Sequence, residues 1–215
     1  RDLKGLDEND FIHVLNSTSP NTRIRQKAVV ACNALSKFLE LGFNFSGYRG
    51  DYSPFTSVQA RDIPDDETIV RKGLEIPNPA WQWAYGMLAT YGLRNHEVFR
   101  CDPSDLELLK IEADSKTGEH YAVSFPDEWI KLFNLEAVII PPLDLTRSNK
   151  ALGNAVTQQF KRYGIPFTPY ALRHAWAIRT WRAGWPDSES AKAMGHSVQV
   201  HYRIYQRWTG TETRR

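Results

Sequence analysis

The stretch TPYALRH at residues 168–174 opens the segment that decides the fold of this 215-residue chain. Thr168 is a good helix cap, and Pro169 suits the first helical position, where its missing N–H costs nothing. The apolar and aromatic residues that follow predict a helix over residues 169–183, which Gly184 ends. The first turns of this helix therefore carry three polar or aromatic side chains that can do chemistry: Tyr170, Arg173 and His174.

Two more helices are expected after this one, over residues 187–194 and 197–208. The sequence MGHS at residues 194–197 joins them. Tyr205 lies on the second of these helices, nine residues after His196. The C-terminal part of the chain thus places an arginine, a histidine and a tyrosine on neighbouring elements.

Two segments further upstream carry charged residues, one just past an expected helix end and one at an expected hairpin turn. The sequence TYGLRNHE at residues 90–97 places Arg94 just past a helix expected over residues 80–91, with Glu97 three residues further on. Residues 106–111 and 119–125 are typical of strands, and the turn sequence between them predicts a hairpin with Lys116 near its tip.

The chain divides into parts of different character. Helices expected at residues 9–15 and from Pro20, capped by Ser19, to about Leu41 give residues 1–45 a helical character. Residues 46–65 are rich in Gly, Ser, Pro, Asp and aromatics and predict a linker. Residues 66–215, with further helices at 126–133 and 147–163, predict a domain that is mainly α with a small antiparallel β-sheet.

Composition narrows the class of protein. The hydrophobic fraction of 41% and charged fraction of 24% are ordinary for a soluble globular protein. No apolar run approaches the roughly 20 residues that span a bilayer, and Cys32 and Cys101 are too few and too far apart for a disulfide framework. A cytoplasmic setting is therefore expected. The absence of an initiator Met suggests a piece of a longer chain.

Charge is unevenly spread along the chain. Residues 161–215 contain ten Lys and Arg against three acidic residues, although the whole chain has a net charge of only +2. A basic C-terminal part hints at a polyanionic partner.

Each of the singled-out residues also has an ordinary structural explanation. Arg94 and Glu97 could form a surface ion pair, and Lys116 could be a solvated turn lysine. Arg173 and His174 could decorate a helix, and His196 could cap one. Tyr205 taken alone is more often a packed aromatic than a nucleophile.

The order of the motifs favours a specific interpretation. GLRxxE, then KTG in a hairpin, then TPxxLRH, then GHS with a tyrosine nine residues after its histidine resembles the catalytic domain of tyrosine recombinases (the phage-integrase family). The resemblance covers about residues 66–208. Residues 1–45 are similar in position to the end of that family's core-binding, DNA-clamping domain.

The resemblance implies a role for each motif residue. Arg94 and Arg173 would hold the non-bridging oxygens of the scissile phosphate, for which a planar, always-charged guanidinium is suited. Lys116 would protonate the departing 5′ oxygen, and His196 would donate a hydrogen bond to the phosphate. Tyr205 would be the nucleophile that forms a 3′-phosphotyrosyl bond. No metal or other cofactor is implied.

The resemblance also assigns places to Tyr170, Glu97 and His174. Tyr170 occupies the place where the family usually has a histidine; a phenol can donate a hydrogen bond to phosphate but is a poor base at neutral pH. Glu97 would orient Arg94, and His174 would support Arg173. Tyr202 is a rival to Tyr205, which the nine-residue interval favours.

Three functions remain open on sequence grounds. The first is a site-specific recombinase or integrase; the second is a type IB topoisomerase-like enzyme; the third is a non-catalytic DNA-binding accessory protein. The expected partner is double-stranded DNA, associated with a prokaryotic or phage nucleoid, and the family assembles as four protomers on two duplexes. The basic residues expected to contact DNA are Arg23, Arg25, Lys27, Arg203 and Arg207.

Overall fold

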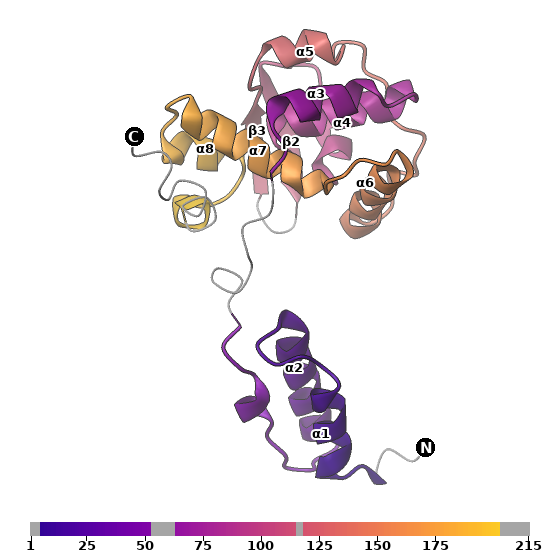
Figure 1. The fold of residues 1–215 in the computed structure, drawn as a ribbon, viewed down its shortest axis with the longest axis vertical. Coiled ribbons are helices and arrows are strands. Elements are labelled where there is room, and N and C mark those ends of the chain that lie inside the picture. Colours follow the sequence, from indigo (N-terminus) through magenta and orange to yellow (C-terminus); the bar gives the residue numbers. More distant parts are fainter. Residues whose placement is uncertain (1–4, 53–62, 115–117, 203–215) are drawn as a thin grey trace. The chain divides into compact units, whose positions relative to one another are not determined.

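The computed structural model describes residues 5–52, 63–114 and 118–202 (Figure 1). It divides the chain into two compact units, Arg1–Ala60 and Arg61–Arg215, which are taken one at a time below. No helix in the described ranges is long and apolar enough to cross a membrane.

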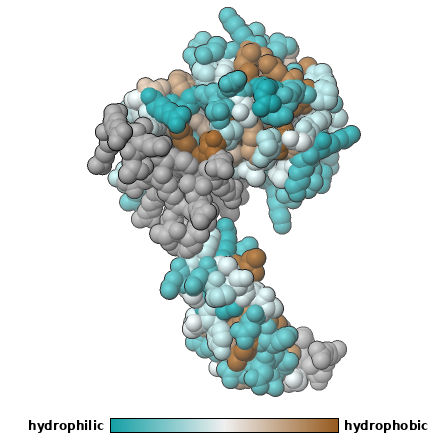
Figure 2. All heavy atoms as spheres, viewed as in Figure 1, coloured by the Kyte–Doolittle hydropathy of each residue, from teal (hydrophilic) through white to brown (hydrophobic). Residues whose placement is uncertain are grey.

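The first unit is a pair of helices closed by a short third piece. Helices α1 (Glu8–Asn16) and α2 (Arg23–Phe38) pack with the 3₁₀ helix η2 (Ser46–Tyr48), which lies in the segment expected to be a linker. A small apolar core forms between them, in which the rings of Phe11 and Phe45 stack with centroids 5.2 Å apart. Polar side chains cover most of the visible face of this unit (Figure 2).

The expected start of the second helix at Pro20 was wrong. The helix begins at Arg23, and Thr22 caps it by accepting a hydrogen bond from the Arg25 backbone N–H at 3.2 Å. Asn21 has a φ of 55° and so cannot belong to a right-handed helix, which moves the cap past Ser19 and Pro20.

The second unit is built around α4 (Pro79–Tyr91), whose side chains are buried almost all round. Asn78 caps this helix, and Gly92 ends it with a left-handed φ of 63°. Trp176 lies so close to Gly92 that an added Cβ would come within 2.8 Å of the indole ring. Both the backbone and the close contact therefore require glycine at this position.

The other helices described in the second unit pack against α4, against one another or against the sheet (Figure 1). They are α3 (Asp66–Leu74), α5 (Glu128–Leu132), α6 (Asn149–Arg162), α7 (Pro169–Arg182) and α8 (Asp187–Ala193). Residues 198–202 are also helical, in agreement with the expected last helix as far as it is described. Helix α3 was not predicted, because its nine residues follow an irregular segment and carry few apolar positions.

The predicted hairpin is confirmed. Strands β2 (Leu108–Asp114) and β3 (Gly118–Val123) pair antiparallel, with Leu109 opposite Ala122, and the two-residue β1 (Cys101–Asp102) adds an unpredicted third strand beside β2. The fold class, mainly α with a small antiparallel sheet, is likewise confirmed.

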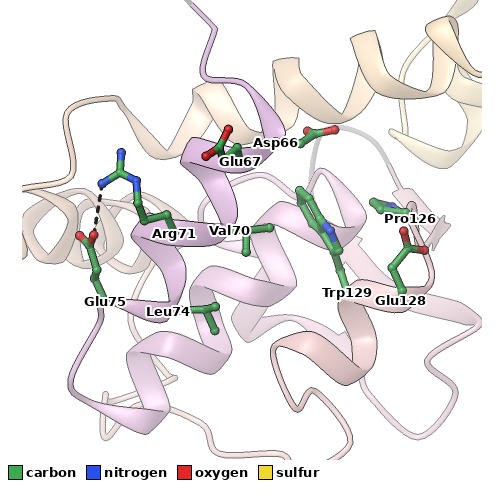
Figure 3. Close-up of a pocket in the computed structure, with 9 residues that line it drawn as sticks. All are labelled: Asp66, Glu67, Val70, Arg71, Leu74, Glu75, Pro126, Glu128 and Trp129. Carbon is green, nitrogen blue, oxygen red and sulfur yellow. Dashed lines mark hydrogen bonds and ion pairs between the residues drawn. The ribbon is translucent and has the colours of Figure 1, made fainter.

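Arg179 links α7 to three neighbouring segments of the second unit. Its guanidinium donates to the Asp66 carboxylate at 2.9 Å and to the Phe125 carbonyl at 2.7 Å, and it stacks over the Trp129 ring at 4.1 Å. Asp66 and Trp129 also line a shallow groove of about 770 Å³ between α3 and α5 (Figure 3). The groove contains none of the residues that the sequence motifs single out.

Candidate active site

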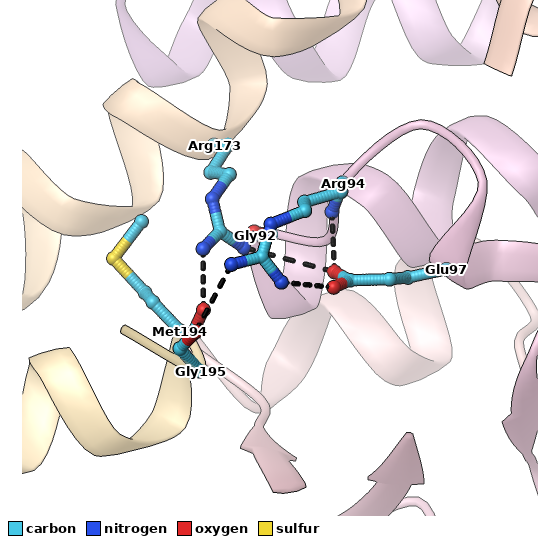
Figure 4. Close-up of polar contacts among 6 residues, drawn as sticks. All are labelled: Gly92, Arg94, Glu97, Arg173, Met194 and Gly195. Atoms are coloured by element: carbon cyan, nitrogen blue, oxygen red, sulfur yellow. Dashed lines mark hydrogen bonds and ion pairs between the residues drawn. The ribbon is translucent and has the colours of Figure 1, made fainter. Parts of the chain in front are cut away.

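Two arginines from distant parts of the sequence meet beside the end of α8 (Figure 4). Arg94 follows the glycine that ends α4, and Arg173 lies in the first turns of α7. Arg94 donates to the Gly195 carbonyl at 3.0 Å, while Arg173 donates to the Met194 carbonyl and, at 2.8 Å, to the Gly92 carbonyl. Carbonyls at helix ends lack intrahelical partners, which makes them ready acceptors for guanidinium groups.

Glu97 contacts both guanidinium groups. One carboxylate oxygen accepts from the Arg94 side chain; the other accepts from the Arg94 backbone N–H at 2.6 Å and lies 3.7 Å from the Arg173 guanidinium. Burial alone would raise the pKa of this carboxyl, but the charges of Arg173 and Arg94 and the hydrogen bonds from Arg94 outweigh it and hold the pKa below its usual value. Glu97 is therefore an anion that contacts both arginines. From the sequence, we expected it to orient only Arg94.

His196 lies directly after the two carbonyls that the arginines bind, and its ring is half-buried. Burial lowers the pKa of His196 to about 3, with further contributions from Arg173, His201, Arg94 and His120. The imidazole is therefore neutral at neutral pH and carries a single N–H.

His120 of β3 lies near His196, as His201 does. The sequence motifs do not include His120. Its ring lies against Gly195, where an added Cβ would come within 2.7 Å of Nε2. Within the described part of the chain, neither of its ring nitrogens has a hydrogen-bond partner. Burial, with a smaller contribution from Arg94, lowers the pKa of His120.

The remaining predicted residues of α7 lie beside Arg173. His174 is 9% exposed and Tyr170 is 38% exposed, and their rings meet edge to face with centroids 4.9 Å apart. Tyr170 thus stands at the more open end of α7. Lys116, Tyr205, Arg203 and Arg207 lie outside the described residues.

The three basic residues of α2 that were predicted to contact DNA differ in their exposure. Arg23 and Lys27 are exposed and line a hollow on α2 together with Arg49, which the sequence motifs do not single out. Arg25 is 8% exposed, and its guanidinium donates to the side chain of Thr18 at 2.7 Å. Arg25 therefore holds the start of α2 in place, and the basic surface of this helix consists of the other residues.

Sequence motifs alone did not reveal His120 and His201. Both are single histidines with no motif around them. A partial signal existed for His201, which precedes Tyr205 by four residues on a segment expected to be helical, so that both would share one helix face.

Comparison with curated proteins found two relatives from Nostoc sp. strain PCC 7120. Excisase C is 30% identical over 241 residues, which cover 96% of this chain and 47% of that protein. Excisase A is 34% identical over 222 residues, covering 86% of this chain and 46% of that protein. The chain spans about half the length of these relatives. No protein-family model matches the sequence.

Solved structures show the same fold at low identity. XerA recombinase matches with a TM-score of 0.53 and 15% identity, over 96% of this chain and 89% of the other. XerH site-specific recombinase bound to its difH substrate matches with a TM-score of 0.59 and 12% identity, over 98% and 72%. The fold, the order of the GLRxxE, KTG, TPxxLRH and GHS motifs, and the relatives agree with one another and support the tyrosine recombinase family.

Proposed function

We propose that this chain breaks and rejoins DNA strands in site-specific recombination, through a covalent bond between Tyr205 and a 3′ phosphate. The observation that carries the proposal is the charge of the buried cluster. Arg94 and Arg173 are always charged and Glu97 is an anion, so the three carry one net positive charge beside a neutral His196. A phosphodiester carries one negative charge, which this cluster offsets.

The chemistry then follows from the residues in their expected roles. The Tyr205 hydroxyl attacks phosphorus and loses its proton to solvent water, the bond from phosphorus to the 5′ oxygen breaks, and Lys116 supplies the proton to that oxygen. Attack by a 5′ hydroxyl reverses the step and releases Tyr205. The phosphotyrosyl bond replaces one phosphate ester by another, so resealing needs no ATP.

The two arginines are exposed to different degrees, which suggests an order of binding. The Arg94 side chain is 21% exposed and that of Arg173 is 2% exposed. A DNA phosphate would therefore reach Arg94 first. We expect Arg173 to exchange its contact with the Met194 carbonyl for a phosphate oxygen as the phosphate settles.

The names of the relatives and of the solved structures favour recombination over the other functions. Both curated relatives are named excisases, which favours excision of a DNA element, and XerH and the Tn1549 transposon integrase were solved with their DNA sites. Arg23, Lys27 and Arg49 on the first unit offer a basic surface for the DNA backbone. We propose assembly on two duplexes as four protomers in the reducing cytoplasm.

Covalent capture of DNA tests this proposal. The chain is incubated with a library of nicked duplexes of random sequence, in which cleavage releases a short strand and traps the protein on DNA. We expect a protein–DNA adduct that survives denaturation and is enriched for one sequence. A topoisomerase-like enzyme would instead relax any supercoiled plasmid, and an accessory protein would bind DNA without an adduct.

Arginine variants make the test specific to the cluster. Arg173→Lys keeps a charge but loses the planar fork, and should slow adduct formation by on the order of 10²–10³. Arg71→Ala is the matched control, because Arg71 forms an exposed ion pair with Glu75. Equal rates in these two variants would refute the proposed role of the cluster.

A further inference from the structure

A short chain of polar side chains leads from solvent to His196. Nε2 of His196 lies 3.2 Å from Nδ1 of His201, with the two rings perpendicular. On the other side of the His201 ring, Nε2 lies 3.8 Å from the Oδ1 atom of Asp187. The Asp187 side chain is 41% exposed and that of His201 is 2% exposed. Asp187, His201 and His196 therefore follow one another in a row that ends beside the arginine cluster.

The backbone holds the His201 ring in this position. Residues 198–202 are helical, and Ser197 caps this helix by accepting a hydrogen bond from the Val200 N–H at 3.3 Å. The His201 N–H donates to the Ser197 carbonyl at 3.0 Å, in the first turn of the helix. The ring is thus fixed by a capped helical turn that begins directly after His196 itself.

We propose that His201 is a positioning residue for His196, and that Asp187 decides which nitrogen of His201 carries the proton. This inference rests on the proposed function, since it concerns a residue of the same phosphate site. It follows from the hydrogen count, because only one proton can lie between Nε2 of His196 and Nδ1 of His201.

The Asp187 carboxylate settles which ring donates. A carboxylate beside Nε2 of a neutral histidine favours the proton on that nitrogen, as carboxylate partners of histidines do elsewhere. Nδ1 of His201 is then an acceptor, and His196 must carry its own proton on Nε2. A phosphate oxygen that arrives at the arginines would take over this Nε2–H from Nδ1 of His201, so that the proton of His196 is already on the nitrogen that donates.

The charges around both rings keep them neutral. His196 faces Arg173, Arg94, His120 and His201, and burial together with the two cations disfavours a second proton. Burial and Arg173 also lower the pKa of His201, and Asp187 opposes this only partly. The tautomer argument thus applies at neutral pH.

The contact between His196 and His201 places a second imidazole ring beside His196. Tyr170 is in contact with His174 at the open end of α7. The imidazole paired with His196 belongs to His201, in the helical segment at residues 198–202.

Nitrogen NMR of the histidine rings tests the inference without any DNA. The full chain is labelled with ¹⁵N, and the ring nitrogens of His196 are assigned by their loss in a His196→Asn variant. In the native protein at pH 7 we expect His196 as a single Nε2–H tautomer. His201→Phe, which fills the space without nitrogen, should give a mixture of tautomers, and Asp187→Asn should do so in part.

Rescue by a conservative variant forms the second arm. His201→Asn retains a hydrogen-bonding group at the place of Nδ1. With the captured DNA substrate, we expect His201→Phe to slow adduct formation about 10–100-fold, as loss of an orienting partner does in comparable sites. His201→Asn should recover most of that loss. Val198→Ala, an exposed position in the same helical turn, should match the native rate.

The outcomes separate the two claims. If the native chain forms no adduct, the proposed function fails, and the NMR arm still decides the role of His201. If the His196 tautomer is the same in the native protein and in His201→Phe, the inference is overturned. It is equally overturned if His201→Asn is as slow as His201→Phe while both remain folded at the assay temperature.

Discussion

Glu97 shows how one side chain determines the geometry of the site. It is 1% exposed. Its carboxylate accepts hydrogen bonds from the backbone N–H and the guanidinium of Arg94, and it forms an ion pair with Arg173. A buried ion pair is sensitive to the loss of one partner, because the other charges are then left uncompensated away from water. Without the carboxylate, the two guanidinium groups would lose the negative charge that both of them contact.

We therefore expect Glu97→Gln to lower the free energy of unfolding by about 3–5 kcal/mol, measured by urea denaturation at pH 7. Glu75→Gln is the matched control, since Glu75 is half-exposed in its ion pair with Arg71 at 3.2 Å. Such a surface pair is worth about 0–1 kcal/mol. Equal losses in the two variants would mean that Glu97 is an ordinary surface carboxylate in solution.

At the scale of elements, the ends of helices place the functional groups. Gly92 after α4 and Gly195 after α8 both have left-handed φ values, and both lie against a ring, of Trp176 and of His120 respectively. The carbonyls of Gly92 and Gly195 accept hydrogen bonds from the arginines. The same residues thus end the helices, admit the neighbouring rings and hold the guanidinium groups.

Two glycine variants separate backbone strain from this close contact. Gly184 also has a left-handed φ, of 82°, but an added Cβ there meets nothing within 4 Å. Gly184→Ala should cost about 1–2 kcal/mol of stability, as a left-handed alanine does. Gly195→Ala should cost roughly 1–3 kcal/mol more from overpacking against His120, and it should slow adduct formation. Indistinguishable melting curves and rates for the two variants would contradict this packing.

The sequence predicted the elements better than their contacts. Proline, glycine and cap residues identified α4, α7 and the hairpin, because those signals act within a few residues. Arg173 was predicted in the site, but its burial against two carbonyls depends on α4 and α8 meeting, which no local pattern encodes. His120 escaped notice for the same reason, since its neighbour Gly195 lies 75 positions further along the chain.

For the whole molecule, three partly or fully buried histidines link stability to pH. Burial is the largest cause that lowers the pKa values of His120, His196 and His201 below 6.5. These histidines therefore bind protons near pH 6.5 in the unfolded chain, but only at lower pH in the folded chain. Each such group makes folding less favourable by about 1.4 kcal/mol per pH unit as the pH falls through this window.

Thermal and urea denaturation between pH 7 and pH 5 should show this loss on the acid side. His120→Gln removes one of the three groups, so its stability should fall less steeply over this range, by about 1.4 kcal/mol per pH unit at most. His13→Gln, which changes a histidine on α1 in the other unit, is the control variant. Parallel curves for the native protein and His120→Gln would show that the histidine is protonated equally in both states.

The central claim is that this chain forms a covalent bond with DNA through Tyr205, and mass spectrometry of the trapped adduct tests it most directly. After nuclease and protease digestion, we predict a nucleotide remnant on the peptide that contains Tyr205, and no adduct from Tyr205→Phe. Tyr202→Phe should form the adduct as the native chain does, since Tyr202 is 52% exposed and three residues away. An adduct that persists in Tyr205→Phe, or a remnant found on Tyr202, would contradict the account.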